Sequence, residues 1–149
     1  MDSIRILSME KKDCEQVALV AGNNLPEKLT LETLMDVLQY EYNHFYIAYD
    51  TNMDKVIGFA GMMVIVDEAE LLYIAVDSPY RSKGIGQLLL KQVEEKARQS
   101  CANRILLEVR NSNKAAQCFY EKNDFTLMTK RKAYYSNPTE DALIMEKRL

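Results

Sequence analysis

The chain has 149 residues, and we expect residues 1–149 to form a single domain with its own buried core. Hydrophobic residues make up 48% of the sequence and charged residues 28%, as in ordinary globular proteins. The net charge of −3 argues against general binding to nucleic acids or anionic membranes, because both need a basic surface. The longest apolar run, 56–66, is too short to span a bilayer, and the N-terminal segment 1–5 lacks the pattern of a signal peptide.

Cysteine and histidine are scarce. The three cysteines, Cys14, Cys101 and Cys118, are far apart, and His44 is the single histidine. This spacing predicts neither a disulfide framework nor a metal site, and it favours reduced thiols in a cytoplasmic protein. Cys118 has no histidine near it in the sequence, so we expect it to be buried and inert.

The first half of the chain alternates between strand and helix patterns. Residues 4–7 predict a strand, and helical spacing predicts a helix over 11–21. The segment 22–26 is predicted to break that helix, and Thr30 is a suitable N-cap for a second one that carries Leu31, Leu34, Met35 and Leu38 on one face. Strands over 45–49 and 56–66 are predicted to form a hairpin around the polar loop 50–54.

The second half of the chain predicts a strand over 71–76 that is apolar on both faces and therefore lies near the sheet centre. An amphipathic helix follows over about 84–99. The strand predicted over 105–109 is reached through this helix, so it should pair in parallel with 71–76. A helix over about 114–122 and a hairpin of 125–135 with 142–147 complete an α/β domain with a mixed sheet.

Two glycines, Gly84 and Gly86, open the helix that follows the buried strand. Unpaired backbone N–H groups and the helix dipole favour anions at a helix start, and Arg81 and Lys83 add positive charge. The segment matches neither the P-loop nor the dinucleotide-binding fingerprint. A tight turn with solvated basic residues is the alternative, and it is the favoured one when this hexapeptide is taken alone.

Glu108 and Tyr120 are candidates for a general base and a general acid. Glu108 lies among apolar residues of a strand, and desolvation there would raise the pKa of its carboxyl group; spacing alone favours a solvated strand face instead. Tyr120 is able to donate a proton to a thiolate, or it packs in the core as tyrosines usually do. Asn113 most simply caps the helix that starts at Lys114.

Taken together, these segments resemble the GCN5-related N-acetyltransferase (GNAT) superfamily, and in particular its RimI branch, which acetylates the N-terminal alanine of a small-subunit ribosomal protein. Arg81–Gly86 matches the acetyl-CoA signature (Q/R)-x-x-G-x-(G/A), and residues 107–113 read LEVRNSN, as in that branch. The segments 119–122, 132–135 and 140–145 resemble the parts of the branch that follow. The good match runs from Glu70 to Met145, and the first third agrees only in its order of elements.

The resemblance implies the GNAT fold: a mixed, mostly antiparallel seven-stranded sheet with splayed central parallel strands and about four helices. It also implies acetyl-CoA as co-substrate, with the backbone of Ile74, Ala75 and Val76 pairing with the pantetheine arm. N–H groups over 82–87 (Ser82, Lys83, Gly84, Ile85, Gly86 and Gln87), next to Arg81, would hold the pyrophosphate, and Asn113 would touch the cofactor. Glu108 would be the base and Tyr120 the acid, while Tyr134 and Tyr135 are candidates to line the substrate side.

The implied reaction is direct transfer of an acetyl group to a primary amine, first of all the N-terminal alanine amine of a ribosomal protein. Two departures from the branch bear on this. Its frequent Phe-x-x-Pro-Trp segment reads Gly22–Pro26 here, and its Leu-Gly-Phe reads Asn123-Asp124-Phe125, where we expect Asn123 to take the left-handed backbone of a helix end. The alternatives are a small amine such as a polyamine or aminoglycoside, a lysine side chain, or an acyl-CoA sensor without catalysis.

Overall fold

The computed structural model describes residues 3–149; Met1 and Asp2, which belong to the segment tested for a signal peptide, lie outside the described residues. The strands are β1 (Ile4–Ser8), β2 (Asn43–Asp50), β3 (Lys55–Ile65), β4 (Glu68–Val76), β5 (Arg104–Arg110), β6 (Thr126–Tyr135) and β7 (Glu140–Arg148). The helices are α1 (Cys14–Asn24), α2 (Leu31–Val37), α3 (Ile85–Gln99) and α4 (Lys114–Lys122), with short 3-10 turns η1 (Lys11–Asp13) and η2 (Ser78–Tyr80).

These strands form one mixed sheet in the order β1-β2-β3-β4-β5-β7-β6. Only β4 and β5 pair in parallel. The predicted mixed, mostly antiparallel seven-stranded sheet with four helices is therefore confirmed, and β4 lies at its centre. Within residues 3–149, no helix is both long and apolar enough to cross a membrane.

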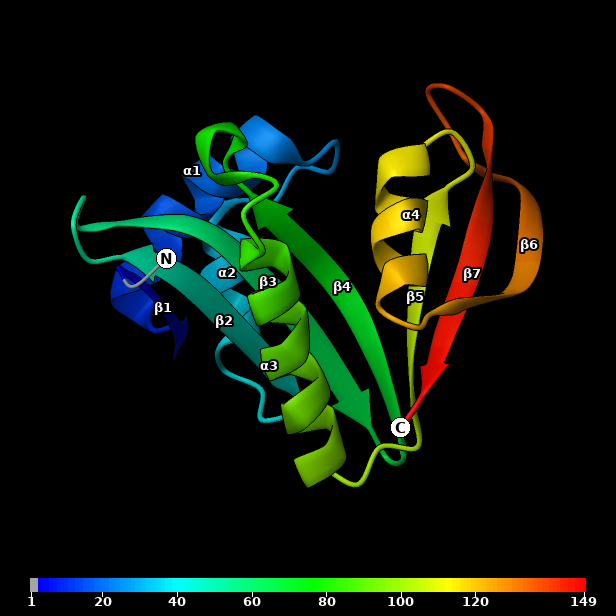
Figure 1. Ribbon diagram of the computed structural model, residues 1–149, viewed down its shortest axis with the longest axis horizontal. Coiled ribbons are helices and arrows are strands. Elements are labelled where there is room, and N and C mark those ends of the chain that lie inside the picture. The colour runs from blue at the N-terminus through cyan, green and yellow to red at the C-terminus, as the bar shows by residue number, and fades with distance from the viewer. Residues whose placement is uncertain (1–2) are drawn as a thin grey trace.

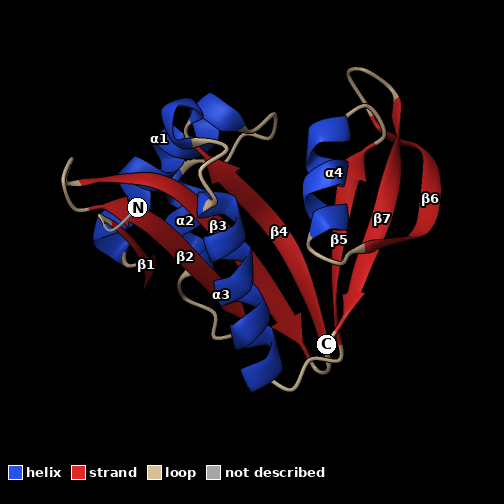
Figure 2. Ribbon diagram, viewed as in Figure 1, coloured by secondary structure: helices blue, strands red, loops and turns tan. Residues whose placement is uncertain are grey.

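Helices cover both faces of the first half of the sheet (Figures 1 and 2). Alternate residues of β2 point to opposite faces, so Phe45 and Ile47 pack with α1 and α2, while Tyr46 and Ala48 pack with α3. The buried face of α3 has apolar residues at helical spacing, which include Ile85, Leu89, Leu90, Val93 and Ala97. In the second half, α4 overlaps β5 in Figure 1, and the Gln117 side-chain amide of α4 donates to the Arg110 carbonyl of β5 at 3.1 Å.

The two central strands separate soon after they meet. Parallel pairing joins only Glu68 to Arg104, Ala69 to Ile105 and Glu70 to Leu106. Beyond this point β4 and β5 diverge, as Figure 1 shows, so the predicted splay is confirmed. The predicted partner segment 71–76 was wrong in register, because β4 begins at Glu68 and its later residues run away from β5.

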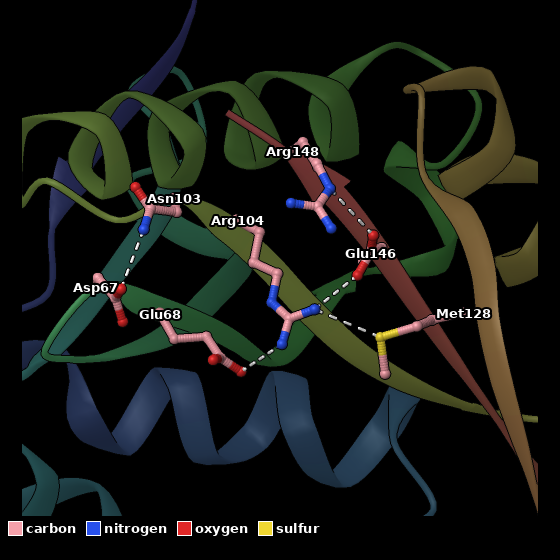
Figure 3. A network of polar contacts seen from close by, with 7 residues as sticks. All are labelled: Asp67, Glu68, Asn103, Arg104, Met128, Glu146 and Arg148. Carbon is pink, nitrogen blue, oxygen red and sulfur yellow. Dashed lines mark hydrogen bonds and ion pairs between the residues drawn. The ribbon is translucent and has the colours of Figure 1, made fainter.

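Polar contacts hold the strands together at the point where they meet (Figure 3). The guanidinium of Arg104 contacts the Glu68 carboxylate of β4 at 3.4 Å and the Glu146 carboxylate of β7 at 2.8 Å. Nearby, the Asn103 backbone N–H donates to the Asp67 carbonyl at 2.7 Å, and the Asn103 side-chain amide donates to the Asp67 carboxylate at 3.0 Å. We call these five residues the apex network.

The first helix begins and ends three residues later than the predicted range 11–21. It continues through Gly22 to Asn24, whose side-chain amide donates to the Val20 carbonyl at 2.8 Å. The break comes at Leu25, which is extended because a residue before proline is disfavoured in helical conformation, and Pro26 follows. The break therefore lies within the predicted breaker segment 22–26, although the helix continues past Gly22, because a single glycine lowers helix propensity without ending a helix.

Other helix ends follow the sequence closely. The Thr30 hydroxyl accepts a hydrogen bond from the Thr33 backbone N–H at 3.1 Å, which confirms the predicted N-cap of α2. At the end of α4, however, Asn123 has a φ of −104° and Asp124 has a φ of 71°. Asp124 thus takes the left-handed conformation that was predicted for Asn123, at the position where the branch has glycine.

The outer strands of the sheet differ in length and exposure. β1 has five residues and pairs with β2 alone. β6 pairs with β7 alone, and nine of its ten residues are exposed. The register of β6 against β7 shifts between Leu127 and Thr129 and again between Arg131 and Tyr135.

Gly61 of β3 sits against the ring of buried Phe45, and an added Cβ would lie 2.5 Å from the ring atoms Cε2 and Cζ. We expect Gly61→Ala to lower the free energy of unfolding by about 1–3 kcal/mol, because the buried ring must shift in a filled core. Chemical denaturation measures this change. The matched control is Gly22→Ala in α1, where a Cβ meets no atom within 4 Å and stability should rise by about 0.5–1 kcal/mol. Unchanged stability in Gly61→Ala would contradict the prediction.

Candidate active site

A cavity of about 930 Å³ fills the opening between the diverging strands. Residues of β4 and β5, the α1–α2 loop, the start of α3 and one side of α4 line it. The sequence-predicted residues lie on several of these elements, and the cavity brings most of them together. Lys83, Ile85 and Tyr134 are not among its lining residues.

The edge of β4 that faces the cavity has backbone groups turned toward the opening. Val76 lies opposite Gly58, and the Asp77 N–H donates to the Ile57 carbonyl at 2.8 Å. Because antiparallel pairing alternates, the N–H and C=O groups of Ile74 and Val76 point away from β3, and those of Ala75 point toward it. Only two of the three predicted residues therefore offer backbone groups to a ligand.

The Arg81 side chain joins three segments of the site. Its Nε donates to the Val76 carbonyl at 2.9 Å, and its Nη2 donates to the Asn24 side chain. Asn24 in turn donates to the Asp77 carboxylate at 2.7 Å. These contacts fix the end of β4 against the end of α1, so Arg81 shapes the loop as well as adding charge to it.

The loop after Arg81 opens α3 with an uncapped helix start. Ser82 and Gly84 have left-handed backbones, with φ of 61° and 84°. Gly84 is the N-cap residue and supplies no side-chain cap, so the first-turn N–H groups up to Gln87 present positive potential at the cavity. Ile85 is 1% exposed and belongs to the core, and it does not line the cavity. Lys83 is exposed beside Tyr80.

Glu108 projects from β5 into the cavity and is exposed. This exposure confirms the solvated strand face, which the spacing favours over a desolvated carboxylate. The Tyr134 hydroxyl donates to Glu108 Oε1 at 3.3 Å, and this contact raises the pKa of Tyr134. Half-buried Glu70 lies near the start of the opening, where burial and then the charge of Glu108 raise the pKa of its carboxyl group. Sequence reasoning missed Glu70 because the predicted strand began one residue later.

Tyr120 is both a core residue and a cavity residue. It is 8% exposed and packs against the rings of Phe119 and Phe125, with centroids 5.4 and 5.6 Å away. It also lines the cavity, and no group among residues 3–149 hydrogen-bonds its hydroxyl. Burial, followed by the negative charge of Glu27 on the α1–α2 loop, raises the pKa of Tyr120. The phenol therefore stays protonated in the free protein at neutral pH.

The start of α4 is built from contacts that also reach the closing hairpin. Asn113 Oδ1 accepts a hydrogen bond from the first turn of α4 at 3.2 Å, which confirms the predicted cap. The Glu140 carboxylate accepts from the Ser112 N–H at 2.6 Å and pairs with Arg110 at 3.3 Å. The guanidinium of Arg110 lies 4.3 Å from the ring centroid of Tyr135, which places that predicted tyrosine at the cavity.

Cys118 is exposed and lines the cavity, so its predicted burial was wrong. The reason is that α4 is short and buries Tyr120 instead, while Cys118 lies on a different side of the helix. Within the described residues, no cluster of histidine, cysteine, aspartate or glutamate is arranged to hold a metal ion.

Comparison with known proteins places this chain in a family. Over 97 residues the chain is 39% identical to the [ribosomal protein bS18]-alanine N-acetyltransferase of Escherichia coli strain K12, a match that covers 64% of this chain and 66% of that protein. The crystal structure of the ribosomal-protein-S18-alanine N-acetyltransferase from Escherichia coli superposes with a TM-score of 0.87 at 30% identity, covering 97% of this chain and 93% of that one. Arabidopsis thaliana NAA60 in complex with acetyl-CoA shares the fold, with a TM-score of 0.88 at 16% identity and 98% of both chains covered.

The model of the acetyltransferase (GNAT) family matches residues 11–125, which include β2 to β5, the helices α1 to α4 and the loop before α3. Since this match covers more than half of the chain, the protein belongs to the acetyltransferase (GNAT) family and is an acetyl-CoA-dependent N-acetyltransferase.

Proposed function

We propose that this protein transfers the acetyl group of acetyl-CoA to the N-terminal alanine amine of a ribosomal protein. The observation that carries the proposal is the single cavity in which an uncapped helix start, an open strand edge, a carboxylate and a phenol meet. The relative from Escherichia coli that acts on ribosomal protein bS18 supports the choice of acceptor.

In this proposal, acetyl-CoA lies along β4 with its pyrophosphate at the start of α3. The first-turn N–H groups of α3 bind the phosphate oxygens, because a helix start combines free donors with positive potential. The N–H and C=O groups of Ile74 pair with the pantetheine amides as a further strand would, while the Val76 C=O accepts from Arg81 and the Val76 N–H is left for the thioester. Asn113, whose Oδ1 is used by the α4 cap, has its amide N–H groups left for the cofactor.

The amine attacks the thioester directly. Glu108 takes a proton from the ammonium, either itself or through a water; Tyr134 occupies Oε1 and leaves Oε2 for this task. An α-amine has a pKa of about 7.7–8.0, so removal of one proton at neutral pH is a modest demand. The Val76 N–H stabilises the oxyanion, and Tyr120 protonates the departing thiolate, whose pKa is about 8.5. The second proton, which the attacking nitrogen loses as the amide forms, restores the Tyr120 phenol, and the first proton leaves Glu108 for solvent. No covalent intermediate on Cys118 is needed.

The acceptor is a protein N-terminus in the cytoplasm. Tyr134 and Tyr135, which stack edge to face with centroids 5.2 Å apart, would line the side where the peptide enters. The exposed Glu108 and the half-buried Glu70 favour the approach of a positively charged amine. The net charge of −3 speaks against nucleic acid as a partner in the reaction.

A mass-spectrometric assay with acetyl-CoA tests the acceptor. The panel contains a basic peptide that begins with alanine, the same peptide with its N-terminus blocked, a lysine peptide and spermidine. We expect a gain of one acetyl group on the free alanine peptide alone. Acetylation of the blocked peptide or of spermidine would move the substrate class to a lysine side chain or a small amine, and binding of acetyl-CoA without any turnover would favour a sensor.

Loss of the base should slow the chemical step selectively. We expect Glu108→Gln to lower kcat by about 10²–10⁴-fold, because the amine loses its proton acceptor, while the affinity for acetyl-CoA stays close to that of the wild type. Steady-state kinetics and calorimetry give the two values. The matched control is Glu95→Gln on the exposed side of α3, which should leave both unchanged. If Glu108→Gln turns over as fast as the wild type from about pH 6 to 9, Glu108 is not the base.

The effect of removing the Tyr120 hydroxyl on kcat should depend on the leaving group of the donor. We expect Tyr120→Phe to lower kcat with acetyl-CoA by about 10²-fold, at the lower end for general acid catalysis, because the thiolate loses its proton donor. An aryl thioester, whose more acidic thiol leaves without help, should recover most of the rate. Tyr46→Phe is the control, since Tyr46 is buried with a raised pKa but lies outside the cavity. An equal fall in kcat with acetyl-CoA and with the aryl thioester would show that Tyr120 acts through packing.

A further inference from the structure

Tyr80 connects the predicted phosphate loop to a distant turn of the sheet. It ends η2, immediately before the loop 81–86, and its ring is half-buried at the edge of the cavity. Its hydroxyl donates to Asp50 Oδ2 at 2.8 Å, across 30 residues of sequence. Neither residue belongs to the acetyl-CoA signature in the sequence.

Asp50 is a fixed partner for this hydroxyl. It is 5% exposed at the end of β2, and its Oδ1 accepts hydrogen bonds from the backbone N–H groups of Asn52 and Met53 at 3.0 and 3.4 Å. The Tyr80 hydroxyl and these N–H groups lower the pKa of Asp50, so it stays charged and accepts a strong hydrogen bond. The β2–β3 turn therefore holds Tyr80 in one position.

The Tyr80 ring in turn contacts the phosphate loop. The Lys83 ammonium lies 5.9 Å from the ring centroid, and the Lys55 ammonium of β3 lies at the same distance from that centroid. Both distances are in the range of cation–π attraction, which restricts a long and otherwise mobile side chain. One ring thus gathers two positive charges next to the uncapped start of α3.

We propose that Tyr80, held by Asp50, is a positioning residue for the diphosphate of acetyl-CoA. Its hydroxyl is committed to Asp50, so it acts through the loop 81–86 and through Lys83 rather than on the ligand itself. The inference rests on the proposed placement of acetyl-CoA along β4 and deepens it. It predicts that Tyr80 matters for the nucleotide part of the donor and not for the acetyl-pantetheine part.

Two donors separate this role from a general structural one. S-acetylpantetheine carries the same thioester as acetyl-CoA but lacks the diphosphate. We expect Tyr80→Phe to raise KM for acetyl-CoA and Kd for coenzyme A by about 2- to 10-fold, the effect of one lost hydrogen bond, with kcat unchanged. KM for S-acetylpantetheine should not change. Tyr40→Phe, in an exposed tyrosine that stacks on Tyr42 away from the cavity, is the matched control.

A double-mutant cycle tests the link to Asp50. Asp50→Asn should weaken coenzyme A binding on its own and add little to Tyr80→Phe, because both changes break one contact. The proposal would be overturned if Tyr80→Phe raised KM equally for acetyl-CoA and S-acetylpantetheine. Fully additive effects of Tyr80→Phe and Asp50→Asn on coenzyme A binding would also overturn it. Calorimetry with coenzyme A needs no acceptor, so a failure of the wild-type protein to bind it would refute the proposed function itself, whereas wild-type binding that Tyr80→Phe leaves intact refutes only the role of Tyr80.

Discussion

The structure depends on the short length of the parallel pairing between β4 and β5. Three residue pairs join these central strands, and the Arg104 guanidinium bridges carboxylates of β4 and β7 at the same place. A central strand normally has partners along both edges, and buried N–H or C=O groups without partners cost about 1–3 kcal/mol each. The open part of β4 is tolerated because it borders a cavity, where water or a ligand satisfies these groups. The apex network fixes where that cavity begins.

This opening also explains why the functional groups come from both halves of the sheet. The start of α3 and the edge of β4 belong to one half, while Glu108, Asn113 and Tyr120 belong to the other. Tyr120 is fixed by two aromatic rings, and Asn113 by the first turn of α4. One buried cluster includes Ile85 of α3 together with Leu107 of β5 and Tyr120 of α4, so the phosphate-binding and proton-transfer functions that we propose share one core.

Much of this arrangement was predictable because short sequence patterns indicate its helix caps, strands and turns. Helix caps at Thr30 and Asn113, the apolar strand near the sheet centre and the glycines before α3 all lie in short segments. The rest depends on contacts between distant residues. Arg81 reaches Asn24 over 57 positions, and Tyr80 reaches Asp50 over 30, so sequence patterns did not reveal either contact. The spacing indicated the exposure of Glu108, but the exposure of Cys118 depends on which face α4 turns toward the cavity, and no local pattern specifies that.

The two outer edges of the sheet have a further consequence for behaviour at high concentration. An exposed edge strand is a template on which another chain can add a strand and begin to aggregate. β1 is only five residues long, and β6 has two register shifts and carries three consecutive cationic side chains, Lys130, Arg131 and Lys132. Short length, repulsive charge and irregular register each oppose such pairing. The accessible edges of the sheet therefore discourage self-association, while the edge with regular free backbone groups lies inside the cavity.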